Sequence, residues 1–319
     1  MGAVNLLPLD RVEIITLTDN YIDLAAGGNT DVVKRGRPAG ASALSGSILA
    51  EHGFSALIRT EEKHDKHALL LDFGLSEDVA ARNAKTLGID LSEIEEAVLS
   101  HGHKDHFGGV LQLGKSIRKK NIPLTAHPSA FKPKRFIALK PGMKVSMPSP
   151  EETRFSEAGF SVIKTDQPKT LLKDHVLFLG EIPRQTPFEK GMPNAIFEQD
   201  GKETHDPLED DTALVIHVKG RGLIIVSGCA HAGIVNTVRH AQRVTGISNV
   251  HAVMGGFHLT GPVFEPIIDE TVAALKAIKP DYIIPTHCTG RKAIQAIENQ
   301  MPGAFILNMA GTTLIFSTP

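Results

Sequence analysis

The most informative part of this sequence is the stretch Leu99-Ser100-His101-Gly102-His103-Lys104-Asp105-His106-Phe107-Gly108-Gly109. In extended chain, residues i and i+2 point to the same side, so His101 and His103 can bind one ion together. Asp105 and His106 follow where the chain tightens into a turn, and they can face a second ion beside the first. Imidazole and carboxylate ligands suit Zn²⁺, and also Fe or Mn. A solvated, histidine-rich turn is the alternative, which this spacing between a strand and a helix disfavours.

Composition narrows the class of protein. The chain has 319 residues, of which 41% are hydrophobic and 22% charged, and its formal net charge is -2. We find no apolar run long enough to span a bilayer and no secretory signal, so we expect a cytoplasmic protein without a membrane partner. Near-neutral charge argues against a nucleic-acid partner. Two cysteines cannot form a disulfide framework, whereas 15 histidines are an unusual number. Oligomeric state stays open, a homo-oligomer included.

The pattern of apolar residues predicts two β-rich halves that are each flanked by helices. Hairpins come early in each half and β-α units follow, which favours a four-layer αββα sandwich over a single doubly wound sheet. We expect one domain, 1–319, with an insertion at about 128–160 where Pro and Lys accumulate. The segment Ala25–Gly46 is predicted to be a loop. The expected strands include Ser55–Thr60, His67–Asp72, Ala97–Leu99, Ile122–Thr125, Val176–Leu179, Ala213–Val218, Gly222–Val226, Val250–Met254, Asp281–Ile284, Ala304–Leu307 and Thr313–Phe316. The expected helices are Glu77–Gly88, Gly109–Lys119, Gly233–Val244, Pro266–Ile278 and Arg291–Met301.

The histidine stretch resembles the signature of the metallo-β-lactamase-fold hydrolases. Leu70-Leu71-Asp72-Phe73-Gly74 is similar to the first motif of that superfamily, a strand ending in Asp-x-Gly. Further phrases resemble its methanopterin-biosynthesis (dihydropteroate-synthase-like) branch and cover most of the chain. They are Glu51-His52-Gly53-Phe54-Ser55, Gly180-Glu181-Ile182-Pro183-Arg184, Asp210-Asp211, Gly228-Cys229-Ala230-His231-Ala232-Gly233, Gly255-Gly256-Phe257-His258-Leu259 and Thr286-His287-Cys288-Thr289-Gly290.

The resemblance implies that the protein binds two divalent metal ions, with Zn²⁺ as the expected metal. It also implies that residues outside the histidine stretch serve as ligands. His287 stands where the superfamily has its last histidine. Cys229 stands where a bridging carboxylate is expected, and Glu181 lies in the region of a usual Gly-His-Thr. His231, on a loop after a strand, can supply the missing imidazole. Whether Cys229, Glu181 or His231 completes the site stays open, because Cys229 could equally be a buried, inert thiol.

Other residues are candidates for substrate binding. His258 ends a strand on the same rim, so we assign it to catalysis or substrate rather than to a metal, with a structural role as the alternative. We assign Asn20 to substrate as well. The helix start at Thr289, Arg291 and Lys292 favours anions, as does the helix start at Ala232–Gly233. Arg184 could hold an anionic group through two hydrogen bonds.

Three functions follow from the resemblance and the motifs. The first is hydrolysis of an ester or phosphoester, on a small anionic molecule, by a hydroxide between two metal ions that Asp105 helps to orient. The second is a transferase that condenses a dihydropterin with an aminobenzene ribosyl phosphate. The third is a ligand-binding module that retains metal but catalyses no reaction. The intact set of candidate ligands in the histidine stretch disfavours this alternative.

Overall fold

The computed structural model describes residues 3–40 and 47–319, and strands that are apolar on both faces form its centre. In β15 (Gly222–Ser227), Leu223 and Ile225 pack into one hydrophobic cluster, whereas Ile224 and Val226 pack into another. A strand of this kind must be covered on both sides. The molecule meets this requirement by stacking layers.

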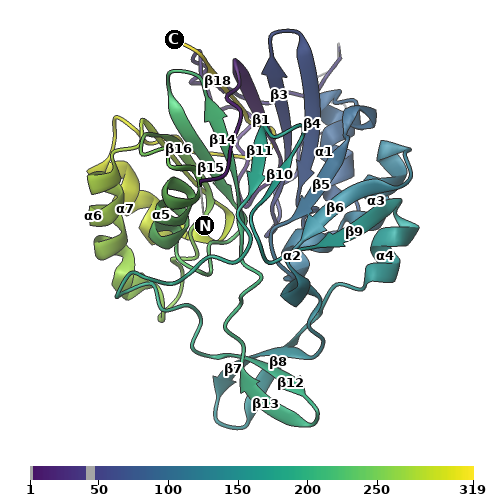
Figure 1. Ribbon diagram of the computed structural model, residues 1–319, viewed down its shortest axis with the longest axis vertical. Helices are drawn as coiled ribbons and strands as arrows, with labels where there is room; N and C mark the ends of the chain where they lie inside the picture. Colours follow the sequence, from purple (N-terminus) through teal and green to yellow (C-terminus); the bar gives the residue numbers. More distant parts are fainter. Residues whose placement is uncertain (1–2, 41–46) are drawn as a thin grey trace.

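Two β-sheets stand face to face in the middle of the molecule (Figure 1). The first sheet has the order β2 (Val33–Lys34), β18 (Thr313–Ser317), β1 (Arg11–Thr18), β3 (Ser55–Glu62), β4 (Asp65–Leu71), β5 (Glu96–Leu99), β6 (Ile122–Ala126), β9 (Phe160–Lys164). The second has the order β10 (Lys169–Leu171), β11 (Val176–Phe178), β14 (Ala213–Val218), β15, β16 (Val250–Gly256), β17 (Tyr282–Thr286). Each sheet is partly parallel, from β4 to β9 and from β15 to β17.

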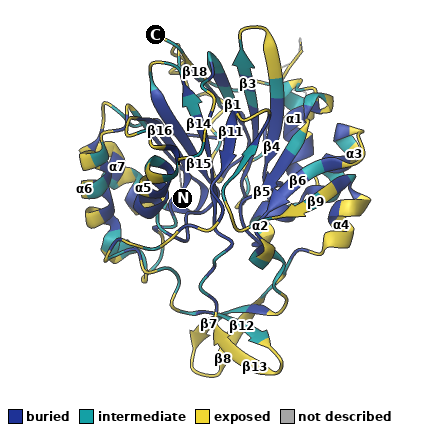
Figure 2. Ribbon diagram, in the orientation of Figure 1, coloured by how far each residue is buried: buried dark blue, intermediate teal, exposed yellow. Residues whose placement is uncertain are grey.

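Helices cover the outer face of each sheet (Figure 1). On the first sheet they are α1 (Val79–Leu87), α3 (Val110–Ile117) and α4 (Glu152–Glu157), and on the second α5 (Ile234–Thr245), α6 (Ile268–Ile278) and α7 (Arg291–Gln300). Three buried clusters separate these four layers, one between the sheets and one under each set of helices (Figure 2). The predicted αββα sandwich is confirmed.

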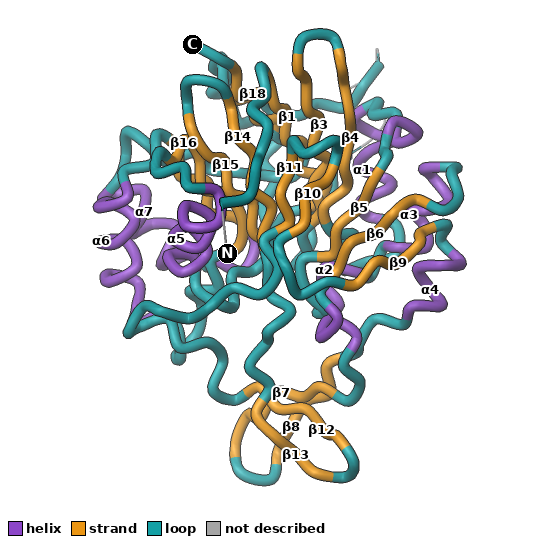
Figure 3. Tube along the Cα trace, viewed as in Figure 1, coloured by secondary structure: helices purple, strands orange, loops and turns teal. Residues whose placement is uncertain are grey.

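A third, four-stranded sheet lies outside these layers, at the bottom of the view (Figures 1 and 3). Its order is β13 (Lys202–His205), β12 (Ala195–Gln199), β7 (Arg135–Lys140), β8 (Met143–Met147). It therefore combines part of the predicted insertion with a later segment that the sequence did not mark. The rest of the insertion, α4 and β9, packs into the body through Phe155 and Phe160.

Some local predictions differ from the structure. The strand predicted at Ala304–Leu307 is wrong, because only Phe305 makes an isolated bridge, to Ile283 of β17. The predicted loop Ala25–Gly46 contains the short strand β2, and its residues 41–46 lie outside the described part. Among the described residues, no helix is long and apolar enough to cross a membrane.

Candidate metal centre

The candidate ligands meet at one edge of the two central sheets, just beyond the carboxyl ends of their parallel strands. His101 and His103 follow β5, and Asp105 and His106 lie in the short helix α2 (Lys104–Phe107). From the second sheet come Cys229 and His231, after β15, and His287, which begins the 3-10 turn η4 (His287–Thr289) after β17. Both halves of the chain thus contribute to one site.

Of the three groups of possible ligand atoms among the described residues, two include residues of the histidine stretch, and these two share Cys229. Asp105, His106, Cys229 and His287 form one group and His101, Cys229 and His231 the other, each with its ligand atoms within 4.8 Å of one another. His106 Nε2 lies 3.1 Å from Cys229 Sγ, and His287 Nε2 lies 3.1 Å from Asp105 Oδ2. His103 belongs to neither group, although its Nδ1 lies 3.2 Å from His231 Nε2.

A buried carboxylate supports His106 from below. Asp72 follows β4 and its Oδ2 lies 2.6 Å from His106 Nδ1, while Ser100 donates to both Asp72 oxygens. Burial alone would lower the pKa of His106, but the carboxylates of Asp72 and Asp105 raise it to about 9. The bond at Nδ1 turns Nε2 toward Cys229, as in metal sites whose histidines are oriented by a carboxylate.

The remaining imidazoles fit a metal ion and little else. Burial and the neighbouring histidines lower the pKa values of His101 and His231 well below the usual range, and burial lowers that of His103 to about 4. Neutral imidazole is the form that binds metal. His101 Nε2 and His231 Nδ1 are buried and have no hydrogen-bond partner within residues 3–40 and 47–319. Buried polar atoms are rarely left unsatisfied, so we interpret these nitrogens as ligand positions.

The two residues that follow β1, Asp19 and Asn20, hold His287 in place. Asn20 contacts both the His287 ring, with Oδ1 3.0 Å from Nδ1, and its carbonyl, and Asp19 accepts from the His287 amide at 2.8 Å. Asn20, predicted for substrate, therefore positions a candidate ligand. Burial would raise the pKa of Asp105, but His106 and His287 hold it well below its usual range.

A second buried network fixes the backbone between His101 and His103. Arg135 of β7 donates to both oxygens of Asp210, at 3.0 and 2.7 Å, and its Nε lies 2.8 Å from Asp206. Asp210 Oδ2 also accepts from the Gly102 amide at 2.7 Å. A Cβ at Gly102 would lie 2.1 Å from the Ala130 carbonyl oxygen, so this close approach requires glycine.

Several predicted substrate residues are engaged elsewhere. Glu181 is exposed and belongs to none of the ligand groups. Arg184 donates to the Pro207 carbonyl, and Thr289 is fully buried, where its hydroxyl accepts from the Phe257 amide. Arg291 and Lys292 are exposed, and Lys292 pairs with Glu265.

The helix start at Ala232–Gly233 does not leave room for an anion, contrary to our prediction. Glu189 accepts from the amides of Val235 and Asn236, at 2.8 and 2.9 Å, and Asp211 accepts from the Ala232 amide at 2.8 Å. These two carboxylates occupy the positive end of α5.

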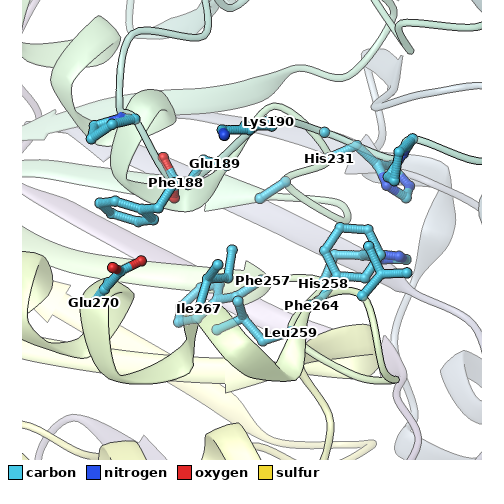
Figure 4. A pocket seen from close by; sticks show the side chains of 16 residues that line it. Phe188, Glu189, Lys190, His231, Phe257, His258, Leu259, Phe264, Ile267 and Glu270 are labelled. Carbon is cyan, nitrogen blue, oxygen red and sulfur yellow. The ribbon is translucent and has the colours of Figure 1, made fainter.

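A pocket of about 500 Å³ opens beside the ligand groups (Figure 4). His231 and His258 lie at one end of it, and Phe188 and Glu270 at the other. The His258 ring is tilted by 50° against the His231 ring, with centroids 4.2 Å apart, and it contacts Phe264 edge to face. The labelled lining is mostly apolar and aromatic, with few charged groups: Phe188, Phe257, Leu259, Phe264 and Ile267 beside Glu189, Lys190 and Glu270.

Sequence reasoning missed the contributions of Arg135 and Asp210 to the site, and the position of Cys288 beside Cys229. Arg135 stands in a lysine-rich stretch that is typical of solvated loops, so nothing local marks it as buried. The doublet Asp210-Asp211 and the phrase around Cys288 were visible only as parts of the family resemblance.

Comparison with known proteins agrees with the geometry. The model of the Metallo-beta-lactamase superfamily matches residues 50–287. The chain is 32% identical, over 91% of its length and 92% of the relative's, to a 7,8-dihydropterin-6-methyl-4-(beta-D-ribofuranosyl)-aminobenzene-5'-phosphate synthase of Methanocaldococcus jannaschii.

Solved structures share the fold. A metal-dependent hydrolase of the beta-lactamase superfamily, Tm1679, matches with a TM-score of 0.72 at 22% identity, covering 96% of this chain and all of the other. Unliganded yeast PDE1 matches with a TM-score of 0.51 at 10% identity, covering 97% of this chain and all of the other. With its ligands at the shared edge of two facing sheets, and a superfamily model that spans them from before Asp72 to His287, the chain belongs to the metallo-beta-lactamase superfamily.

Proposed function

We propose that this protein is a metal-dependent hydrolase of an ester or phosphoester in a small anionic molecule. The observation that carries the proposal is the meeting of five imidazoles, one carboxylate and one thiol from both halves of the chain at a single edge. Two divalent ions bound there, with Zn²⁺ as the expected metal, would supply a nucleophilic water at neutral pH. They would also stabilise the negative charge that develops on the substrate.

The protein's own groups prepare the site for this chemistry. Asp105 stays ionised because His106 and His287 lower its pKa, so its carboxylate can orient a nucleophile and accept a hydrogen bond from it. The imidazoles of His101, His103 and His231 are neutral and available as ligands. Asp72 orients the ring of His106, and Asn20 orients the ring of His287, each through a contact at Nδ1.

The pocket beside His231 accommodates the part of the substrate that does not react. Its apolar walls exclude water from one side of the reacting bond, and few charged groups face it. Lys190 at its edge is a candidate partner for the substrate's anionic group, and His258 lies between pocket and ligands. We place a small-molecule partner here.

A second candidate function is transfer rather than hydrolysis. The relative named as a pterin-related synthase is 32% identical over nearly the whole chain, which favours condensation of a dihydropterin with an aminobenzene ribosyl phosphate. In that reaction the dihydropterin alcohol would enter as its diphosphate, and pyrophosphate would leave as the new bond forms. Aromatic walls formed by Phe188, Phe257 and Phe264 suit a planar ring.

The test compares the two reactions on zinc-loaded protein. If the protein is a hydrolase, we expect turnover of chromogenic phosphodiesters such as bis(p-nitrophenyl) phosphate. If it is a transferase, we expect it to condense the dihydropterin with the aminobenzene ribosyl phosphate. His103→Ala should abolish turnover and lower metal content, while Lys134→Ala, an exposed substitution outside the site, should change neither. Full metal content and full rate in His103→Ala would contradict the site assignment. Absence of both reactions in the metal-loaded protein would contradict the proposed activities.

A further inference from the structure

Two cysteines and a histidine form a third group of ligand atoms behind the centre. Cys229, His258 and Cys288 follow three neighbouring strands of the second sheet, β15, β16 and β17. Their ligand atoms lie within 4.8 Å of one another, and the two thiols are 2% and 4% exposed. Only Cys229 also belongs to the groups that we assign to the two-metal centre.

The fold makes room for this group. A Cβ at Gly256 would lie 2.6 Å from Cys288 Sγ, so the absence of a side chain there lets the thiol approach β16. The Cys288 thiol lies 3.7 Å from the Cys229 carbonyl oxygen, a long distance even for a hydrogen bond from sulfur. His258 Nδ1 is buried and has no hydrogen-bond partner among the described residues.

The backbone at His258 is also unusual. Its φ of 44° lies in the left-handed region, which costs a non-glycine residue on the order of 1–3 kcal/mol and persists where the surroundings enforce it. This conformation keeps the ring at the inner end of the pocket, against His231 (Figure 4). Two buried thiols therefore converge with an imidazole nitrogen that lacks a hydrogen-bond partner among the described residues, and a bound cation would satisfy that nitrogen.

We propose that Cys229, His258 and Cys288 bind a third, thiophilic cation of the Zn²⁺ class, in addition to the two ions of the hydrolytic centre, with which it would share the Cys229 thiolate. Two thiolates and one imidazole are a preferred ligand set for Zn²⁺, and three protein ligands leave a fourth position open. Zn–S bonds of about 2.3 Å place tetrahedral sulfur ligands about 3.8 Å apart. That separation is compatible with ligand atoms that all lie within 4.8 Å of one another.

His258 lines the pocket, so a cation bound to its ring would lie beside the inner end of the pocket. A cation there would give the apolar pocket a positive charge at its inner end, suited to an oxygen or nitrogen of the ligand. This inference goes beyond the proposed hydrolysis, since the third cation can be counted whether or not turnover is observed.

The test is a titration of the reduced, chelator-treated full-length protein with Co²⁺ alone, under anaerobic conditions. Bound Co²⁺ per chain is measured after gel filtration by elemental analysis and by native mass spectrometry. Absorption from thiolate–Co²⁺ charge transfer is followed in the near ultraviolet. We expect three Co²⁺ per chain in the wild type and two in Cys288→Ser, with a weaker charge-transfer band in the variant.

His258→Ala provides a second variant, since this partly exposed side chain can be removed even if Cys288→Ser does not fold. It should also bind two Co²⁺. His127→Ala is the matched control, a buried histidine after β6 that belongs to none of the three groups, and it should keep three. A wild type that binds two ions or fewer, or variants that keep three, would overturn the proposal.

Discussion

At the scale of single residues, the pair His106–Asp72 shows how burial and neighbouring charge determine the pKa of a candidate metal ligand. Both side chains are fully buried, and Asp72 Oδ2 lies 2.6 Å from His106 Nδ1. A charged imidazole is stabilised there mainly by its carboxylate neighbours, which explains why the pKa of His106 rises to about 9 although burial acts in the opposite direction.

This pair predicts how the metal-free protein responds to pH. A raised pKa contributes stability that is complete below the unfolded value of about 6.5 and disappears as the pH rises through 9. The shift corresponds to a contribution on the order of 3 kcal/mol. Chelator-treated wild type should therefore exceed Asp72→Asn in unfolding free energy at pH 6.5, and the difference should shrink toward pH 9.5. Urea denaturation at several pH values measures this, and a difference independent of pH would contradict it.

What the sequence could predict at this scale depends on distance along the chain. His101, His103, Asp105 and His106 are neighbours, so their spacing alone predicts a common site. Arg135 lies far from its partner Asp210 in sequence, and only the fold brings them together. Cys229 and His231 appeared as alternatives in the sequence, whereas the structure brings both to the same site.

At the scale of elements, β7 does more than form the small outer sheet. Its first residue, Arg135, is 2% exposed and reaches through Asp210 to the Gly102 amide, between two candidate ligands. Burial would raise the pKa of Asp210, but Arg135 keeps it well below its usual range. Through Asp210, the outer sheet therefore contacts the segment that carries His101 and His103.

We predict that Arg135→Ala destabilises the protein by about 3–5 kcal/mol, because it leaves the charge of Asp210 buried without its partner. Affinity for Zn²⁺ should fall as well, since Gly102 loses its fixed position. The neighbouring Lys134→Ala, which removes an exposed pair with Glu198, should cost no more than about 1 kcal/mol. Denaturant unfolding and zinc titration compare the two variants. Equal effects would show that the network does not support the site.

Helices and strands could be predicted from the sequence where the local pattern of apolar residues determines them. Alternating and continuous apolar runs predicted the strands β14 to β17, because both faces of these strands are buried. The strand expected at Ala304–Leu307 failed because an apolar run also suits a segment that packs beside β17 through one bridge. The start of α5 carried an anion-binding pattern, but Glu189 from a distant segment satisfies it.

At the scale of the whole molecule, the site joins two halves that share a hydrophobic layer. The first sheet contributes Asp72 and the histidine stretch, and the second contributes Cys229, His231 and His287. Ions bound across this edge favour the folded state, since the unfolded chain does not hold these ligands together.

Metal should therefore raise the stability of the whole protein. At a free Zn²⁺ concentration a thousand times the dissociation constant, one site contributes about 4 kcal/mol. The melting temperature should increase with zinc concentration in the wild type and much less in His287→Ala. Differential scanning calorimetry measures both, and a wild type that melts at the same temperature with and without zinc would contradict this.

The central claim, that ligands from both sheets form one metal centre, is tested most directly by anomalous diffraction from zinc-loaded crystals. We predict anomalous peaks within the two ligand groups, one beside Asp105 and His287 and one beside His101 and His231. Crystals that hold zinc only elsewhere, or not at all, would contradict the account.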